Sequence, residues 1–234
     1  MAASAATKAL LLDLDGTLLD TAPDMANALN LLRGEQSTAP LAFAAIRPHV
    51  SHGAAALVRL GFPDAPDEQM VELRARFLEL YRENLSAGTR LFDGFEAVLR
   101  RLEGDGIRWG VVTNKPAFLS EPLLEAVGLR SRMACIVSGD TVAQRKPHPA
   151  PMLHAAKLVG CEPAACLYVG DAERDVVAAH AAGMPALVAL FGYLSESDTP
   201  HAWGADGLID SPADILRWIG APARAAGVIA PAIP

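Results

Sequence analysis

Short apolar runs alternate with amphipathic segments along most of the chain. The apolar runs end at Asp, Asn, Gly or Ser, as strands buried on both faces of a sheet often do. They predict strands at Ala9–Leu14, Arg108–Thr113, Ala134–Ser138, Cys166–Val169 and Ala186–Leu190, with an edge strand at Gly207–Ile209. Helical spacing between them predicts helices at Gly94–Glu103, Ala117–Val127, Ala150–Leu158 and Ala172–Ala182. Strand then helix, repeated about every 25 residues, predicts an α/β fold with a parallel sheet covered by helices on both faces.

One interval departs from this rhythm. The first predicted strand ends at residue 14 and the second begins at residue 108, whereas a βαβ unit needs only about 30 residues. Apolar residues at helical spacing predict helices at Pro23–Leu32, Gly53–Leu60 and Asp67–Leu85. We therefore expect residues 21–88 to be an inserted helical domain and residues 1–20 plus 89–234 to form the core. The Ala/Pro-rich segment 221–234 is expected to fray.

Composition restricts the kinds of molecule that the protein is expected to bind. Of the 234 residues, 51% are hydrophobic and 20% are charged, which indicates a folded globular protein. A net charge of −7 without basic runs argues against nucleic acid, and the lack of a long apolar run argues against a membrane span. No signal peptide is recognisable, and the three cysteines have neither a disulfide nor a zinc spacing. We expect a cytoplasmic monomer or homodimer that binds a small molecule.

Polar residues gather at the carboxyl ends of the predicted strands. They are Asp13 and Asp15 after the first strand, Thr113 and Asn114 at the end of the second, Lys146 after the third, and Asp171 after the fourth. An open parallel sheet binds ligands outside these ends, so we expect the residues to meet in one crevice. Each alone has an ordinary explanation as a turn, a solvated loop or a helix N-cap. Their coincidence at four strand ends favours a functional site.

Asp13 and Asp15 suit phosphoryl transfer. A carboxylate can attack phosphorus and divide hydrolysis into two displacements through an aspartyl-phosphate, and Asp13 directly ends its strand. Strand alternation places Asp15 on the same face as Asp13. There it can protonate the leaving alkoxide and then deprotonate the attacking water, which contributes about 10²–10⁴-fold. The expected substrate is a small phosphate monoester.

The charge of the phosphate requires a local positive site. Mg²⁺ takes one or two carboxylates, with water and phosphate oxygens as its remaining ligands. The predicted protein ligands are Asp13, the backbone carbonyl of Asp15, and Asp171. Lys146 is expected to give a positive charge to the phosphoryl group and the nucleophile. Asp175, four residues after Asp171 on one helix face, either supports the metal or is a plain helix-face carboxylate.

Three further residues are predicted to bind the phosphate oxygens. Thr113 can donate its hydroxyl and Asn114 an N–H group. Gly16, which follows Asp15, lets backbone N–H groups approach closely because it has no side chain.

With these residues in place, the sequence resembles the haloacid dehalogenase-like hydrolase superfamily. Four segments match its motifs in order: residues 12–21 (LDLDGTLLDT), 111–116 (VVTNKP), 145–149 (RKPHP) and 169–175 (VGDAERD). The resemblance implies a Rossmann-like core, Mg²⁺, and an α-helical cap inserted after the first strand. That is where the spacing already predicts an insertion.

Asp15 separates activities within this superfamily. The resemblance implies a phosphatase or phosphoglucomutase, because dehalogenase members typically lack this second aspartate. Residues 109–116 (WGVVTNKP), 191–193 (FGY) and 203–206 (WGAD) look most like phosphoglycolate phosphatases and N-acetylmuramic acid 6-phosphate phosphatases. The implied substrate is 2-phosphoglycolate. A sugar phosphate and a β-phosphoglucomutase-like transfer are the alternatives. A silent binding module is a third reading, but binding alone needs no acid/base pair.

We expect residues of the inserted segment to determine substrate specificity. Residues 47–55 (RPHVSHGAA) correspond to the family's cap loop that reaches the active site. We hypothesise that His52 and Arg47 contact the end of the substrate that carries no phosphate. The alternative is a solvated loop in which Ser51 caps the following helix.

Overall fold

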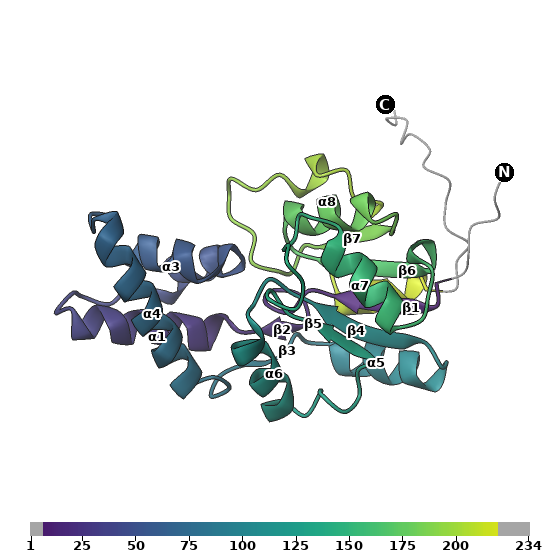
Figure 1. The fold of residues 1–234 in the computed structure, drawn as a ribbon, viewed down its shortest axis with the longest axis horizontal. Helices are drawn as coiled ribbons and strands as arrows, with labels where there is room; N and C mark the ends of the chain where they lie inside the picture. The colour runs from purple at the N-terminus through teal and green to yellow at the C-terminus, as the bar shows by residue number, and fades with distance from the viewer. Residues whose placement is uncertain (1–6, 220–234) are drawn as a thin grey trace.

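The computed structural model describes residues 7–219, so segment 221–234, which was expected to fray, lies outside it. Six parallel strands form one sheet in the order β5-β4-β1-β6-β7-β8 (Figure 1). Their bounds are β1 Ala9–Leu12, β4 Arg108–Val112, β5 Cys135–Val137, β6 Cys166–Gly170, β7 Ala186–Ala189 and β8 Gly207–Ile209. The predicted α/β fold with a parallel sheet is confirmed.

Helices cover both faces of the sheet. They are α5 Phe95–Gly104, α6 Ala117–Ala126, α7 Ala150–Leu158 and α8 Glu173–Ala181. Side chains of alternate β1 residues pack on opposite faces of the sheet, as expected for a strand buried on both sides. Leu10 and Leu12 belong to the core with α5 and α6, whereas Ala9 and Leu11 belong to the core with α7 and α8. The two cores hold the carboxyl ends of the strands in fixed positions.

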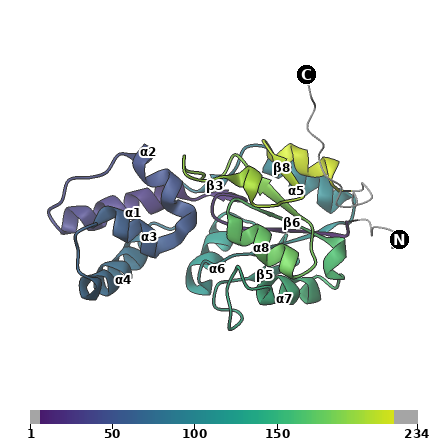
Figure 2. The same cartoon turned by 90° about the horizontal axis from the view of Figure 1, so that it is seen from above.

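The long interval after β1 contains a separate set of helices (Figures 1 and 2). They are α1 Ala22–Glu35, α2 Phe43–Ile46, a 3₁₀ helix Arg47–His52, α3 Gly53–Gly61 and α4 Asp67–Glu83, hereafter the helical insertion. An apolar core packs around these helices, in which Phe77 and Tyr81 are fully buried and to which Leu119 and Tyr193 from the rest of the chain contribute. It joins the rest of the chain through an antiparallel pair, β2 Leu19–Asp20 with β3 Arg90–Leu91. Strands of two residues are too short for alternation to reveal, so the sequence did not predict them.

A carboxylate fastens the two connections of the insertion to each other. Asp24, in the first turn of α1, accepts hydrogen bonds from the backbone N–H groups of Gly88 (2.7 Å) and Thr89 (2.8 Å). The Thr89 hydroxyl adds a third bond of 2.6 Å. The segment that leaves the insertion is therefore bound to the helix that enters it.

The turn after β1 differs from the prediction. The Asp13 N–H still donates to Val169 O (2.9 Å), but the Leu14 N–H donates to the Asp13 carboxylate (2.8 Å). The chain thus leaves the sheet at Leu12, two residues earlier than predicted. Asp15 lies in the turn, so the argument that placed it by strand alternation is wrong.

No helix within residues 7–219 is long and apolar enough to cross a bilayer.

Candidate active site

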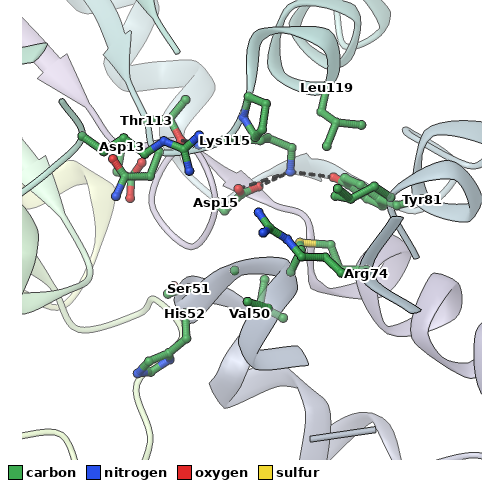
Figure 3. Close-up of a pocket in the computed structure, with 18 of the residues that line it drawn as sticks. Asp13, Asp15, Val50, Ser51, His52, Arg74, Tyr81, Thr113, Lys115 and Leu119 are labelled. Carbon is green, nitrogen blue, oxygen red and sulfur yellow. Dashed lines mark hydrogen bonds and ion pairs between the residues drawn. The ribbon is translucent and has the colours of Figure 1, made fainter. Parts of the chain in front are cut away.

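A cavity of about 290 Å³ lies between the carboxyl ends of the strands and the helical insertion (Figure 3). Asp13 and Asp15 line it from the turn after β1, and Thr113 and Asn114 line it from the turn after β4. His52 lines it from the insertion. Residues far apart in sequence therefore border one space, but Lys146 and Asp171, which were expected in the same crevice, are not among the residues that line it.

Asp13 and Lys146 form a buried ion pair beside this cavity. Both residues are 3% exposed, and Lys146 Nζ lies 2.9 Å from Asp13 Oδ1. The same ammonium group donates to Val112 O (2.9 Å) and to the Tyr168 hydroxyl (2.8 Å), and it lies 2.8 Å from Asp175 Oδ1. These contacts hold the Lys146 ammonium group next to the Asp13 carboxylate. Arg174 adds a second cation, 4.0 Å from Asp13 Oδ2.

Three carboxylates behind the cavity form a site that suits a hard cation. Single oxygens of Asp13, Asp171 and Asp175 lie within 4.8 Å of one another. Burial and the charges of the other two raise the pKa of Asp171 to about 7, although hydrogen bonds from Ser51 and the Tyr193 N–H oppose the rise. Asp171 Oδ1 is buried without a hydrogen-bond partner among the described residues. A buried oxygen without a partner in an electronegative cluster is what a divalent ion would satisfy, so the donor set fits Mg²⁺.

The 3₁₀ helix of the insertion reaches this cluster. Ser51 Oγ donates to Asp171 Oδ2 (2.5 Å), and Arg174 donates to the Ser51 backbone carbonyl (2.7 Å). Gly16 makes room for the contact, because a Cβ there would overlap the Asp171 carboxylate and its φ of 82° suits glycine. The alternative in which Ser51 caps the next helix is wrong, since α3 has His52 as its N-cap and no side-chain cap.

Asp15 is bound to both the sheet side and the insertion. Lys115 Nζ lies 2.9 and 3.2 Å from its two carboxylate oxygens, and the Thr21 hydroxyl donates to Oδ1 (2.8 Å). Lys115 also donates to the hydroxyl of Tyr81 in α4 (2.9 Å) (Figure 3). Burial alone lowers the pKa of Lys115, but Asp15 and Tyr81 raise it above its usual value, so the lysine stays charged. Burial raises the pKa of Tyr81 to about 12, so the hydroxyl stays protonated.

Thr113 and Asn114 line the cavity, but their side chains are hydrogen-bonded to backbone groups of the protein. Thr113 Oγ1 accepts the Lys115 N–H (3.1 Å). The Asn114 side chain accepts the Lys146 N–H (3.0 Å) and donates to Lys146 O (2.9 Å). The structure thus assigns Asn114 a further task, which is to hold the loop that carries Lys146.

The two residues hypothesised to contact substrate are placed differently. His52 borders the cavity, whereas Arg47 does not. Arg47 donates to Phe191 O and Gly192 O (both 3.2 Å), and its guanidinium lies 4.9 Å from the centre of the Tyr193 ring. In this conformation Arg47 binds the loop after β7, so its expected position at the substrate is not observed.

Several side chains at the site were not singled out from the sequence. The polar ones are Lys115, Arg174, Arg145, Arg74 and Tyr81. Lys115 and Arg174 lie inside the second and fourth motifs, and that position was the available signal. Arg74 and Tyr81 lie on α4, where periodicity predicts a helix without indicating which face meets the sheet.

Comparisons with known proteins agree with this geometry. A family model described as "Haloacid dehalogenase-like hydrolase" matches residues 10–189. A phosphoglycolate phosphatase from Xylella fastidiosa is 44% identical over 205 residues, which are 88% of this chain and 90% of that protein. An N-acetylmuramic acid 6-phosphate phosphatase from Pseudomonas aeruginosa is 38% identical over 210 residues, 89% and 93% of the two chains. A crystal structure described as a predicted phosphoglycolate phosphatase from Haemophilus somnus superposes with a TM-score of 0.80 at 28% identity, covering 90% of this chain and 97% of the other.

Proposed function

Since the chain belongs to the haloacid dehalogenase-like hydrolase family, we propose that it is a Mg²⁺-dependent phosphatase that forms an aspartyl-phosphate on Asp13. Family membership and hydrolysis of phosphoric monoesters were both predicted from the four motifs, and the matched relatives confirm both. The covalent intermediate, the metal and the substrate are the parts that remain proposals.

The observation that carries the proposal is the surroundings of Asp13. Its carboxylate is buried, lies 2.9 Å from Lys146 Nζ and borders the cavity. In the first step an Asp13 oxygen attacks phosphorus, and the bond from phosphorus to the ester oxygen breaks. Asp15, on the same cavity wall, gives its proton to the departing alkoxide. Lys146 and Arg174 offset the negative charge that gathers around the phosphoryl group.

The second step returns the enzyme to its starting state. Water attacks phosphorus and the bond to Asp13 breaks, which releases inorganic phosphate. Asp15 accepts the proton that the water loses. The contacts from Lys115 and Thr21 hold the Asp15 carboxylate in one position for this purpose.

The metal would be held by Asp13 and Asp171, with Asp175 close to both. The Asp15 side chain is engaged by Lys115, so the proposed ligand from Asp15 stays its backbone carbonyl. When bound, Mg²⁺ would neutralise charge on the phosphate oxygens and orient the phosphoryl group toward the nucleophile. Asp175 also lies 2.8 Å from Lys146 Nζ, so it would position the lysine as well as support the metal.

The proposed substrate is 2-phosphoglycolate, with N-acetylmuramic acid 6-phosphate as the second candidate because relatives of both kinds cover most of the chain. The test is kcat/KM for a panel of phosphate monoesters that includes these two and simple sugar phosphates. We expect one of the two named esters to exceed the simple sugar phosphates. Free phosphate should be the product without a sugar bisphosphate activator. A requirement for that activator would favour the phosphoglucomutase-like transfer instead.

A further inference from the structure

We propose that Arg74 binds a carboxylate on the substrate, which restricts the enzyme to phosphate monoesters that also carry a carboxylate group. The inference rests on the proposed phosphatase function and assigns the substrate class of the same cavity. Arg74 belongs to α4 and lines the cavity from the insertion (Figure 3). Its side chain reaches from the helix toward the side of the cavity that holds Asp15.

The guanidinium of Arg74 has no anionic partner. Across residues 7–219, no carboxylate oxygen lies within 4.0 Å of it, although α4 is rich in glutamate. Arg76, two residues further along the same helix, contrasts with it, because it pairs with Glu35 at 2.7 Å and Glu79 at 2.9 Å. An arginine that borders a cavity with no internal partner is available to a ligand anion.

The other cations of the cavity each have at least one partner within the protein. Lys115 is paired with Asp15. Arg174 donates to Ser51 O and lies near Asp13, where the phosphate is expected. Arg145 uses its Nε–H on Gly139 O, in the loop after β5. Arg74 is therefore the arginine that the insertion contributes to the cavity, away from the residues assigned to the phosphoryl group.

The residues that line the cavity explain why a carboxylate, the second anionic group of the substrate, would be recognised by Arg74. Met25, Val50, Leu78 and Leu119 are apolar side chains that line the cavity. A carboxylate placed among apolar groups loses hydration, and a guanidinium with its parallel N–H donors compensates that loss well. Arg74 is an exposed residue of α4, and a neutral substituent would offer its guanidinium no charge-assisted contact.

Arg74 also lies at the boundary between this cavity and a second hollow. A second hollow of about 460 Å³ between α3 and α4 shares Ala55, Arg74 and Leu78 with the first. A small ester would lie wholly within the inner cavity, whereas a sugar ester could extend into the outer hollow. In both cases a carboxylate near the boundary would meet the same guanidinium. Both proposed substrates carry one.

The test compares esters that differ in the carboxylate, using the full chain with Mg²⁺. One pair is 2-phosphoglycolate and 2-hydroxyethyl phosphate. The other is N-acetylmuramic acid 6-phosphate and N-acetylglucosamine 6-phosphate, which lacks the lactyl carboxylate. For Arg74→Met we expect kcat/KM on the carboxylated ester of the preferred pair to fall by about 10- to 150-fold, the range of a charge-assisted contact. The fall on its uncharged counterpart should be at least tenfold smaller.

Arg76→Met is the matched control, because it removes the same side chain from the same helix outside the cavity. It should leave the ratio between paired esters at the wild-type value. Arg74→Lys should recover part of the selectivity, since it restores charge without the two parallel donors. Thermal melts confirm that each variant folds. Equal losses of Arg74→Met on both members of the preferred pair would overturn the proposal. A wild-type enzyme that hydrolyses neither pair would instead overturn the proposed function.

Discussion

Replacing Lys115 with methionine tests how the fold prepares Asp15 for proton transfer. Lys115 is 7% exposed, and its Nζ contacts three oxygen atoms: both Asp15 carboxylate oxygens and the Tyr81 hydroxyl. The substitution keeps an unbranched side chain of similar length but removes the charge. Asp15 then keeps only the Thr21 hydroxyl among the side-chain partners described here.

The expected size of the effect follows from burial. Removing one partner of a fully buried ion pair costs about 3–5 kcal/mol. The Asp15 side chain is 17% exposed and borders the cavity, so water screens the carboxylate that is left behind. We therefore expect the free energy of unfolding to fall by roughly 2 kcal/mol. Misplacing an acid/base group worth about 10²–10⁴-fold should lower turnover by on the order of 10- to 100-fold.

The assay separates orientation of Asp15 from general damage. kcat/KM reports formation of the phosphoenzyme, and protonation of the leaving group matters for an alkyl ester but little for p-nitrophenyl phosphate. Lys115→Met should therefore reduce kcat/KM more for the alkyl ester. Tyr81→Phe, which keeps the Lys115–Asp15 pair, should show a much smaller difference. Equal reductions for both esters, or an unchanged kcat/KM, would refute a role for Lys115 in placing Asp15.

The remaining predictions concern the metal, the substrate and the join between insertion and sheet. Chelation by EDTA should stop turnover and Mg²⁺ should restore it; Mg²⁺ should also raise the melting temperature of the wild type but not of Asp171→Asn, and indifference to chelation would contradict the metal assignment. His52→Ala should raise KM for the physiological ester, whereas unchanged KM and kcat would remove His52 from the substrate site. Tyr193→Phe should lower the free energy of unfolding in urea by about 1–3 kcal/mol, because the hydroxyl accepts the Ala22 N–H (2.9 Å) and donates to Asp20 (2.7 Å). A loss below about 0.5 kcal/mol would show that these contacts contribute little.

Much of the fold could be predicted because it depends on local pattern. Each apolar run produced a strand, and the position of the candidate site residues at strand ends followed from a general property of parallel sheets. Asp13, Lys146 and Asp171 were selected as candidate site residues in this way, since each lies within a few residues of a strand whose end can be predicted from the sequence. The exact end of β1 was not predicted, because the Asp13 carboxylate takes the Leu14 N–H away from the sheet.

Contacts between the insertion and the sheet were beyond the reach of the sequence. Whether Ser51 meets Asp171, or Arg47 turns toward the Phe191 carbonyl, depends on how two separately packed units close on each other. No periodicity encodes that arrangement. Lys115 was missed for a similar reason, since its partners Asp15 and Tyr81 come from opposite sides of the cavity.

The central claim is that Asp13 carries the phosphoryl group, and trapping that group tests it most directly. In Asp15→Asn, p-nitrophenyl phosphate should still phosphorylate the enzyme because its leaving group needs little protonation, whereas breakdown lacks the base. After incubation with radiolabelled p-nitrophenyl phosphate and Mg²⁺, acid quenching and peptide mapping should place a hydroxylamine-sensitive phosphoryl group on the peptide that contains Asp13. The label should be absent when Asp13→Asn is added to the same variant. Release of p-nitrophenol with no label on the protein, or with label on another residue, would contradict the account.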